Sequence, residues 1–218
     1  MLLEGGADIE ETDFVLGTPL HVAIASGAPP VVAHLLEKGA SVGAAGELNG
    51  SRPLHLAAEL GLIEIISILL DRGAEIDATD QLGGTALFRA VAAGRGQAAE
   101  RLVARGADVG IADGTTGMLP LHKAAETGQI AVVLLLLDAD VDINARDSLG
   151  MTALHYAATP VSLSNAGGPE LIHVLVERGA NLEARNGSGQ TPLDYAQARS
   201  GYGAFAEIAQ ILQTLAVR

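Results

Sequence analysis

Residues 118–140 read MLPLHKAAETGQIAVVLLLLDAD, and two features of this stretch decide the fold. The first is a Pro-Leu-His motif followed by alanines. Pro120 suits the first turn of a helix, and Leu121 with the alanines forms a narrow packing face. The second feature is the apolar run at 130–137, which is long enough for a short helix. The stretch therefore predicts a pair of short helices.

The Pro-Leu-His motif recurs down the chain at a nearly constant interval. Its other copies are GTPLHVA at 17–23, SRPLHLAA at 51–58, GTALFRA at 84–90, MTALHYAA at 151–158 and QTPLDYA at 190–196. The central leucines of the six copies are Leu20, Leu54, Leu87, Leu121, Leu154 and Leu193, at intervals of 34, 33, 34, 33 and 39 residues. Such a period indicates an array of repeated units rather than one globular domain.

A second apolar element follows each of the first five copies and ends in Gly-Ala, except in the fourth copy, where Asp140 replaces the glycine. A glycine here can adopt positive φ, which ends the helix and turns the chain outward into a hairpin-like finger. Asp tolerates that conformation less well. Threonines such as Thr18, Thr152 and Thr191 precede the motif and can cap the first helix. A unit of two helices and a finger cannot bury its apolar faces alone, so neighbouring units must stack.

These motifs resemble the T-P-L-H-x-A-A and L-L-x-x-G-A-D motifs of the ankyrin-repeat family across nearly the whole chain. The resemblance implies an all-α solenoid of about six repeats with a concave groove, in a single domain spanning 1–218. We place a partial repeat at 1–13, full repeats at 14–47, 48–80, 81–114, 115–147 and 148–186, and a C-terminal capping repeat at 187–218. The longer fifth interval places an insertion at 161–166, which we interpret as a tolerated loop, with a binding loop as the alternative.

Composition excludes several classes of function. The chain has 13 Lys and Arg against 26 Asp and Glu, a net charge of −13, which disfavours nucleic acid and membrane surfaces as partners. The absence of Cys excludes disulfides, thiolate zinc sites and a Cys nucleophile. The longest apolar run is too short to cross a bilayer. We expect a cytoplasmic protein, with the nucleus as the alternative.

Four histidines recur at one position of the motif: His21, His55, His122 and His155. Stacked helices lie ~8–10 Å apart, too far for these rings to share one zinc ion. The family resemblance implies a structural role, in which each histidine ties the start of its helix to adjacent backbone. We therefore expect no metal and no cofactor.

Acidic residues form two further patterns. Asp138, Asp140, Asp142 and Asn144 alternate as in a calcium loop, but Ile143 and Leu149 stand where that loop needs Gly and Glu. A column of acidic residues lies eight or nine residues before the histidine position: Asp13, Asp80, Asp113 and Asp147, with Glu47 or Gly46 in the second copy and Asn186 in the last. The resemblance implies that this column orders the fingers through hydrogen bonds to backbone, so we expect neither calcium nor catalysis.

The resemblance implies a protein-interaction scaffold, not an enzyme, that binds a partner segment in a groove formed by the fingers and first helices. An enzyme or small-molecule binder that uses the groove as a pocket is one alternative. A recruiting or regulatory arm of a larger multidomain protein is another. The expected partner-binding residues interrupt the repeat consensus: Leu48, Leu82, Arg89, Met118, Lys123, Leu149, Met151, Tyr156 and Tyr195.

Two subsets of these residues predict the chemistry of the partner. Arg89, Lys123 and Tyr156 share one column of the first helices, so we expect the centre of the groove to be locally cationic. The leucines and methionines are expected to be exposed on the fingers. The expected partner is a protein segment with carboxylates beside an apolar anchor. Arg89→Ala and Tyr156→Ala should then weaken binding and leave the fold intact.

Overall fold

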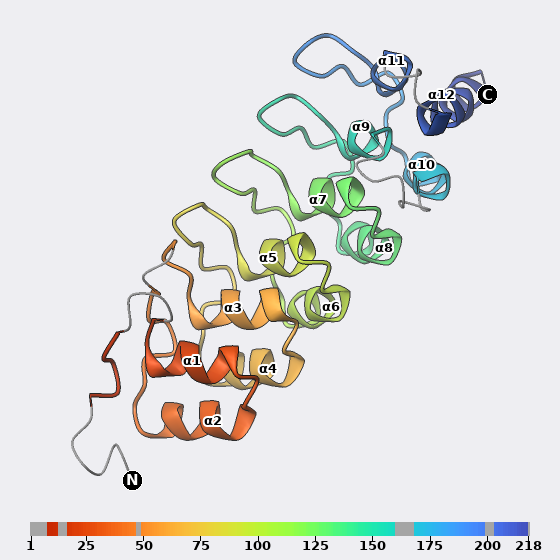
Figure 1. The fold of residues 1–218 in the computed structure, drawn as a ribbon. Helices are drawn as coiled ribbons and strands as arrows, with labels where there is room; N and C mark the ends of the chain where they lie inside the picture. The colour runs from red at the N-terminus through yellow and green to blue at the C-terminus, as the bar shows by residue number, and fades with distance from the viewer. Residues whose placement is uncertain (1–7, 13–16, 47–48, 160–167, 199–202, 218) are drawn as a thin grey trace. The chain divides into compact units, whose positions relative to one another are not determined.

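The structure is a computed structural model in which residues 8–12, 17–46, 49–159, 168–198 and 203–217 are described (Figure 1). Its regular structure in these ranges is helical, with one isolated bridge between Thr79 and Thr85. The all-α prediction is confirmed. No helix in these ranges has the length and apolar character needed to cross a bilayer. The insertion predicted at 161–166 lies outside the described residues.

The chain divides into two compact units, Met1–Asp108 and Val109–Arg218. The helices of the first unit are α1 (Pro19–Ala25), α2 (Pro29–Glu37), α3 (Pro53–Leu60), α4 (Ile63–Asp71), α5 (Ala86–Ala92) and α6 (Gly96–Ala104). Those of the second unit are α7 (Pro120–Glu126), α8 (Ile130–Asp138), α9 (Ala153–Ala157), α10 (Gly168–Glu177), α11 (Pro192–Gln197) and α12 (Gly203–Ala216). Each unit therefore holds three helix pairs, and each pair lies within one of the repeats predicted from the sequence.

Within a unit, the first helices of neighbouring repeats pack on one another, and so do the second helices. In the first unit, α3 packs between α1 and α5, and α4 packs between α2 and α6 (Figure 1). In the second unit, α9 packs on α7 and α11. Loops that we call fingers connect each second helix to the next first helix, at 38–52, 72–85, 105–119, 139–152 and 178–191. The unit of two helices and a finger is thus the repeat that the sequence predicts.

The core of each unit is built from the motif leucines and small residues. In the first unit Leu54, Leu87 and Leu69 are buried beside fully buried alanines such as Ala57 and Ala90. The second unit repeats this arrangement, with Leu121, Leu154, Leu136, Ala124 and Ala153 buried. Because alanine adds almost no side-chain volume, first helices can approach each other closely. Leucines and alanines therefore build a buried core that needs few aromatic residues.

The second helices end as predicted, in a residue with positive φ. Gly39, Gly73, Gly106 and Gly179 have φ between 85° and 97°, and a Cβ atom at any of them would meet no atom within 4 Å. Asp140 occupies the same place after α8 with φ 60°. Since the space is open, only the backbone conformation disfavours a side chain at this position.

Asp140→Gly should therefore raise the free energy of unfolding by about 1 kcal/mol, because glycine adopts positive φ without steric cost. The reverse change at an equivalent place, Gly106→Asp, should lower it by a similar amount. Urea unfolding followed by circular dichroism measures both. Equal midpoints for Asp140→Gly and the wild type would contradict the expectation.

Candidate functional site

Four buried imidazoles each hydrogen-bond both backward and forward along the chain. Each Nδ1 accepts from the backbone N–H three residues earlier: Thr18 (3.3 Å), Arg52 (3.1 Å), Leu119 (2.9 Å) and Thr152 (3.2 Å). Each Nε2 donates to a backbone carbonyl in the finger that follows: Ser51 (3.0 Å), Ala78 (2.9 Å), Ala145 (2.9 Å) and Gln190 (3.0 Å) for His21, His55, His122 and His155. The predicted structural role of these histidines is confirmed.

This bonding requires neutral rings. An Nδ1 that accepts from a backbone N–H cannot also carry a proton, so the proton of each ring lies on Nε2. Burial lowers the pKa of His21, His55, His122 and His155 below the usual value, and the hydrogen bonds to the finger carbonyls oppose this only in part. The four rings are therefore fixed in the uncharged state in which both bonds form.

Stability should accordingly fall as the pH drops below about 6.5, the pKa of an unperturbed histidine. In that window the unfolded chain binds protons that the folded protein does not, so unfolding is favoured as the pH decreases. Urea midpoints measured from pH 7.5 to pH 5.5 should decrease, and His55→Gln should make the decrease shallower. A midpoint that is constant over this range would contradict the assignment.

Two repeats depart from the histidine pattern. Phe88 stands at the histidine position of the third helix pair, where its backbone N–H donates to the Thr85 hydroxyl (3.2 Å). Asp194 stands there in the last pair, and its Oδ2 accepts from the Thr191 N–H (2.9 Å). This backbone bond and one from the Thr191 side chain lower the pKa of Asp194. Both residues keep a capped helix start, but Phe88 has no ring nitrogen to bind the following finger.

The acidic column orders the finger turns, as predicted, at Asp80, Asp113, Asp147 and Asn186, whereas Asp13 and Glu47 lie outside the described residues. Asp80 Oδ1 accepts from the N–H groups of Leu82 (2.9 Å) and Gly84 (3.0 Å). Asp147 Oδ1 accepts in the same way from Leu149 (2.9 Å) and Met151 (2.8 Å). In the fingers at 105–119 and 178–191, the same role falls to Asp113, which accepts from Met118 N–H (2.9 Å), and to Asn186, which accepts from Ser188 and Gln190 N–H (both 3.0 Å). A buried carboxylate or amide oxygen thus fixes each of these turns.

The second carboxylate oxygen of each aspartate has its own side-chain donor or backbone donors. Arg89 donates to Asp80 Oδ2 through Nε (2.8 Å) and Nη2, and the Tyr156 hydroxyl donates to Asp147 Oδ2. Burial and then this hydrogen bond raise the pKa of Tyr156. Burial opposes ionisation of Asp113, but hydrogen bonds from Thr116, Met118 and Thr115 outweigh it and lower the pKa. These donors were not predicted from the sequence, although Arg89 and Tyr156 each follow their aspartate by nine residues.

These pairings correct the predicted cationic surface. Arg89 is paired with Asp80, whose side chain is fully buried, and Lys123 Nζ is paired with Glu126 (2.6 Å). Both predicted cations are thus paired with a nearby carboxylate of this chain, so the prediction that this column is locally cationic is wrong. The expectation that Arg89→Ala leaves the fold intact loses its basis as well, because Arg89 compensates a buried charge.

Arg89→Met should lower the free energy of unfolding by about 2–3 kcal/mol, because it leaves the buried Asp80 carboxylate without its cation. Lys123→Met removes a more exposed ion pair and should cost about 0.5 kcal/mol, which makes it the matched control. Urea unfolding of both variants checks the difference. In a double-mutant cycle, Arg89→Met combined with Asp80→Asn should cost less than the sum of the two single changes. Additive effects would contradict a direct coupling.

The apolar residues of the predicted site divide into exposed and buried pairs. Leu82 and Leu149 are 43% and 67% exposed at equivalent places in their fingers. Met118 and Met151 are each 5% exposed, so the prediction that they lie exposed on the fingers is wrong. Their backbone N–H groups bind the finger aspartates, and Met151 Sδ also accepts from Asn186 Nδ2 (3.5 Å). The methionines are part of the packing that holds the finger turns.

The remaining predicted residues are aromatic or lie outside the described ranges. Tyr156 and Tyr195 are half-buried, and each ring packs edge-on against a histidine of the preceding first helix. The centroid distances are 5.9 Å from His122 to Tyr156 and 6.4 Å from His155 to Tyr195. Leu48 falls outside the described residues. Both tyrosines are thus partly accessible while their rings contact the motif histidines.

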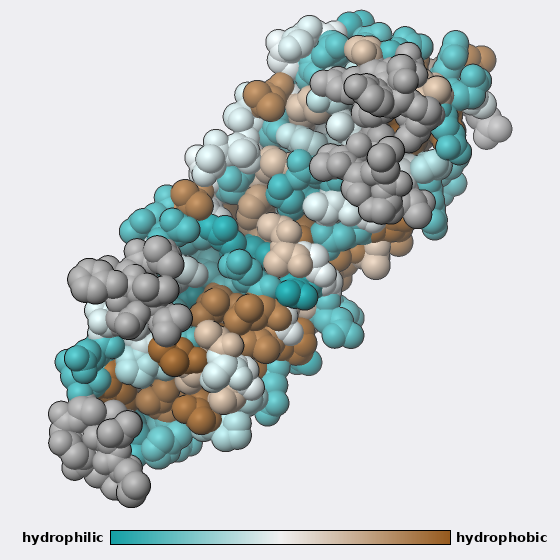
Figure 2. All heavy atoms as spheres, viewed as in Figure 1, coloured by the Kyte–Doolittle hydropathy of each residue, from teal (hydrophilic) through white to brown (hydrophobic). Residues whose placement is uncertain are grey.

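The first helices of the first unit add apolar surface that the sequence analysis did not single out. Val22 of α1 and Leu60 of α3 are exposed, and Leu56 of α3 is half-buried. Figure 2 shows apolar side chains gathered over the region of α1 and α3. Val22 and Leu56 each follow a motif histidine directly, as Arg89 follows Phe88. The exposed apolar residues could therefore have been predicted from the sequence, because Val22 and Leu56 occupy the same position of the repeat as Arg89.

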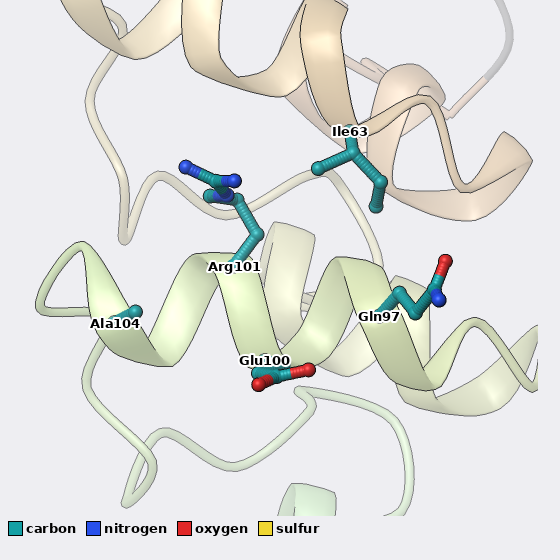
Figure 3. Close-up of a pocket in the computed structure, with 5 residues that line it drawn as sticks. All are labelled: Ile63, Gln97, Glu100, Arg101 and Ala104. Atoms are coloured by element: carbon teal, nitrogen blue, oxygen red, sulfur yellow. The ribbon is translucent and has the colours of Figure 1, made fainter.

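The part of the chain that the structure describes holds no evident metal site. No group of three or more His, Asp or Glu residues there could hold a metal ion. One open hollow of about 320 Å³ lies between α4 and α6. Arg101 and Gln97 extend from α6 toward Ile63 of α4, whereas Glu100 points away (Figure 3). These residues include no nucleophile paired with a base, so the hollow has no evident catalytic arrangement.

The fold and the finger geometry define a repeat protein, and comparison with known proteins names the family. A family model described as ankyrin repeats (3 copies) matches residues 1–80, 20–113, 87–185 and 121–215. The chain therefore belongs to the ankyrin-repeat family, as the sequence motifs predict.

Similar proteins are found among both curated sequences and solved structures. Human B-cell lymphoma 3 protein is 33% identical over 199 residues, which cover 90% of this chain and 42% of that protein. The mouse homolog is 36% identical over 115 residues, 53% of this chain and 24% of that protein. Human protein phosphatase 1 regulatory subunit 27 is 34% identical over 79 residues, 36% of this chain and 47% of that protein. The chain thus spans less than half the length of these relatives.

Two solved structures share the fold over most of the chain. The ankyrin repeat domain of Bcl-3, described as a unique member of the IkappaB protein family, has a TM-score of 0.79 at 31% identity. It covers 97% of this chain and 89% of its own. Another ankyrin repeat protein has a TM-score of 0.78 at 28% identity, and covers 89% of this chain and 96% of its own.

Proposed function

We propose that the chain is a protein-interaction scaffold that binds a partner segment on its fingers and first helices and catalyses no reaction of its own. The observation that carries this proposal is the placement of Leu82 and Leu149. Both are large apolar side chains exposed at the same position of a finger turn, where folding gives no reason for them. An exposed apolar residue repeated at one place in two repeats favours a role in binding.

The turns that carry these leucines are already fixed before any partner binds. The backbone N–H groups of Leu82 and Leu149 each donate to a buried aspartate of the finger, at 2.9 Å. A side chain held on an ordered turn loses less conformational freedom on binding than one on a mobile loop. Leu82 and Leu149 are therefore suited to act as apolar anchors, one in each compact unit.

The first helices extend the apolar surface beyond the fingers. Val22 and Leu60 are exposed in the first unit, and Tyr156 and Tyr195 are half-buried in the second. Tyrosine is a favoured residue at the centre of protein interfaces. The similarity to protein phosphatase 1 regulatory subunit 27, which is named as a regulatory subunit, also supports a partner-binding role.

The partner proposed from these residues is a protein segment with an apolar anchor. Carboxylates in the partner would have to compete with Asp80 for Arg89 and with Glu126 for Lys123. We therefore assign most of the affinity to the apolar contact and little to the carboxylates expected from the sequence. The affinity should then change little between low and high salt.

Leu149→Asp and Leu82→Asp should each weaken partner binding at least tenfold, about 1.4 kcal/mol, because a charge replaces an apolar anchor. Val31→Asp is the matched control, since Val31 is similarly exposed on α2, away from the fingers. The four immobilised proteins are used to capture partners from the source lysate, and the captured proteins are quantified by mass spectrometry. The partner is then purified and titrated against each variant.

The control variant separates a specific loss of partner binding from the general effect of adding a charge to the surface. Val31→Asp should retain the partner at the level of the wild type, and circular dichroism should show all variants folded. Equal recovery of every captured protein by all four baits would contradict the proposed binding surface.

A further inference from the structure

Two Asn-Gly dipeptides occur in the sequence, Asn49-Gly50 and Asn186-Gly187, and both lie in fingers. An asparagine before a glycine is prone to an intramolecular reaction, because glycine has no side chain to shield its backbone nitrogen. That nitrogen attacks the side-chain carbonyl carbon, Cγ, and closes a five-membered succinimide ring. The asparagine side chain must rotate toward the nitrogen for this attack, so the fold decides which of the two asparagines reacts.

Asn186 is held in a geometry that prevents the attack. It is 7% exposed, and its Oδ1 accepts from two backbone N–H groups of its own turn, both at 3.0 Å. Its Nδ2 donates to Met151 Sδ at 3.5 Å. The attacking nitrogen is also engaged, since the Gly187 N–H donates to the Leu149 carbonyl at 2.7 Å. Reaction at this dipeptide therefore requires the turn to unfold.

Asn49 is exposed, in contrast, at the finger position where Leu82 and Leu149 stand, five residues before the motif leucine. Its φ of 60° is followed by φ 59° at Gly50, and two successive positive values are typical of tight Asn-Gly turns. Gly50 is buried beneath the side chain of Gln81, an exposed residue whose long side chain can move aside. Asn49 is therefore the accessible one of the two asparagines.

We propose that Asn49 is a site of spontaneous deamidation in the folded protein. The Gly50 nitrogen loses its proton to a base from solvent and attacks Asn49 Cγ. A new N–C bond forms, the bond from Cγ to Nδ2 breaks, and Nδ2 takes up a proton and leaves as ammonia. Water then adds to either ring carbonyl carbon and opens the ring to aspartate or isoaspartate. The net reaction consumes one water and releases one ammonia, and it needs no enzyme.

Both products change the contact between two neighbouring fingers of the first unit. The Asn49 carbonyl accepts from the Gln81 N–H at 2.9 Å, and a Cβ atom placed on Gly50 would lie 2.9 Å from Gln81 Cγ. Isoaspartate carries one more main-chain atom than asparagine, so this close fit is lost. Either product also places a carboxylate where the next finger exposes Leu82. Ageing at this position therefore loosens the finger and makes its surface acidic.

The two dipeptides permit a test within one chain. The folded protein is incubated in mildly alkaline buffer and digested with trypsin, which does not cut before Pro53. The peptides 39–72 and 186–199 then each contain a single asparagine. Mass spectrometry measures conversion from the mass gained when NH2 is replaced by OH, against an unincubated sample digested in parallel.

Asn49 should convert at least about tenfold faster than Asn186 in the folded protein, because Asn186 reacts only after local unfolding. In guanidinium chloride the two should convert at similar rates, and both should yield isoaspartate as well as aspartate. Equal rates in the folded protein would overturn the proposal. Conversion of Asn49 that occurs only in denaturant would overturn it as well.

Asn49→Gly is the matched control for the consequence, since glycine adopts positive φ and has no amide to lose. Incubation should lower the urea midpoint of the wild type by roughly 0.5 M, measured by circular dichroism, and leave that of Asn49→Gly unchanged. An equal decrease in both proteins would overturn the effect assigned to Asn49. So would a converted wild type with an unchanged midpoint.

Discussion

A single imidazole that accepts on one nitrogen and donates from the other is the interaction on which most repeats of this protein depend. The first helices are short, seven residues in α1 and five in α9, and helices of that length are not stable alone in water. The Nδ1 bond closes the start of the helix, and the Nε2 bond joins it to the finger that leads into the next repeat. One histidine side chain therefore stabilises both the start of its own helix and the contact with the following finger. To make both bonds it must stay buried and neutral.

The finger aspartates place a second demand on the structure, because a buried carboxylate needs donors for both oxygens. Backbone N–H groups of the turn satisfy one oxygen, and Arg89 or Tyr156 satisfies the other at Asp80 and Asp147. Residues that look like an exposed recognition surface are thereby used to complete the fold. What the finger offers to a partner is a rigid turn with an outward leucine rather than a free charge.

The repeated pattern explains why so much of the fold could be predicted from the sequence. Helix pairs follow from the spacing of the motif leucines, and the helix ends follow from glycines such as Gly73 and Gly106, which adopt positive φ. Positions 118 and 151 were misjudged because a methionine that departs from a consensus looks exposed until its neighbours are known. Arg89 was misjudged for a related reason, since its partner Asp80 is distant by nine residues and becomes adjacent only when the finger folds back.

The forward bond of the histidine ends on main-chain carbonyls, and these belong to four kinds of residue at five positions: Ser51, Ala78, Gly84, Ala145 and Gln190. Every amino acid supplies a backbone carbonyl, so this acceptor does not depend on which side chain stands there. Mutation can therefore diversify these finger positions over evolutionary time, or in a designed library, while the tie that holds the repeats together is kept.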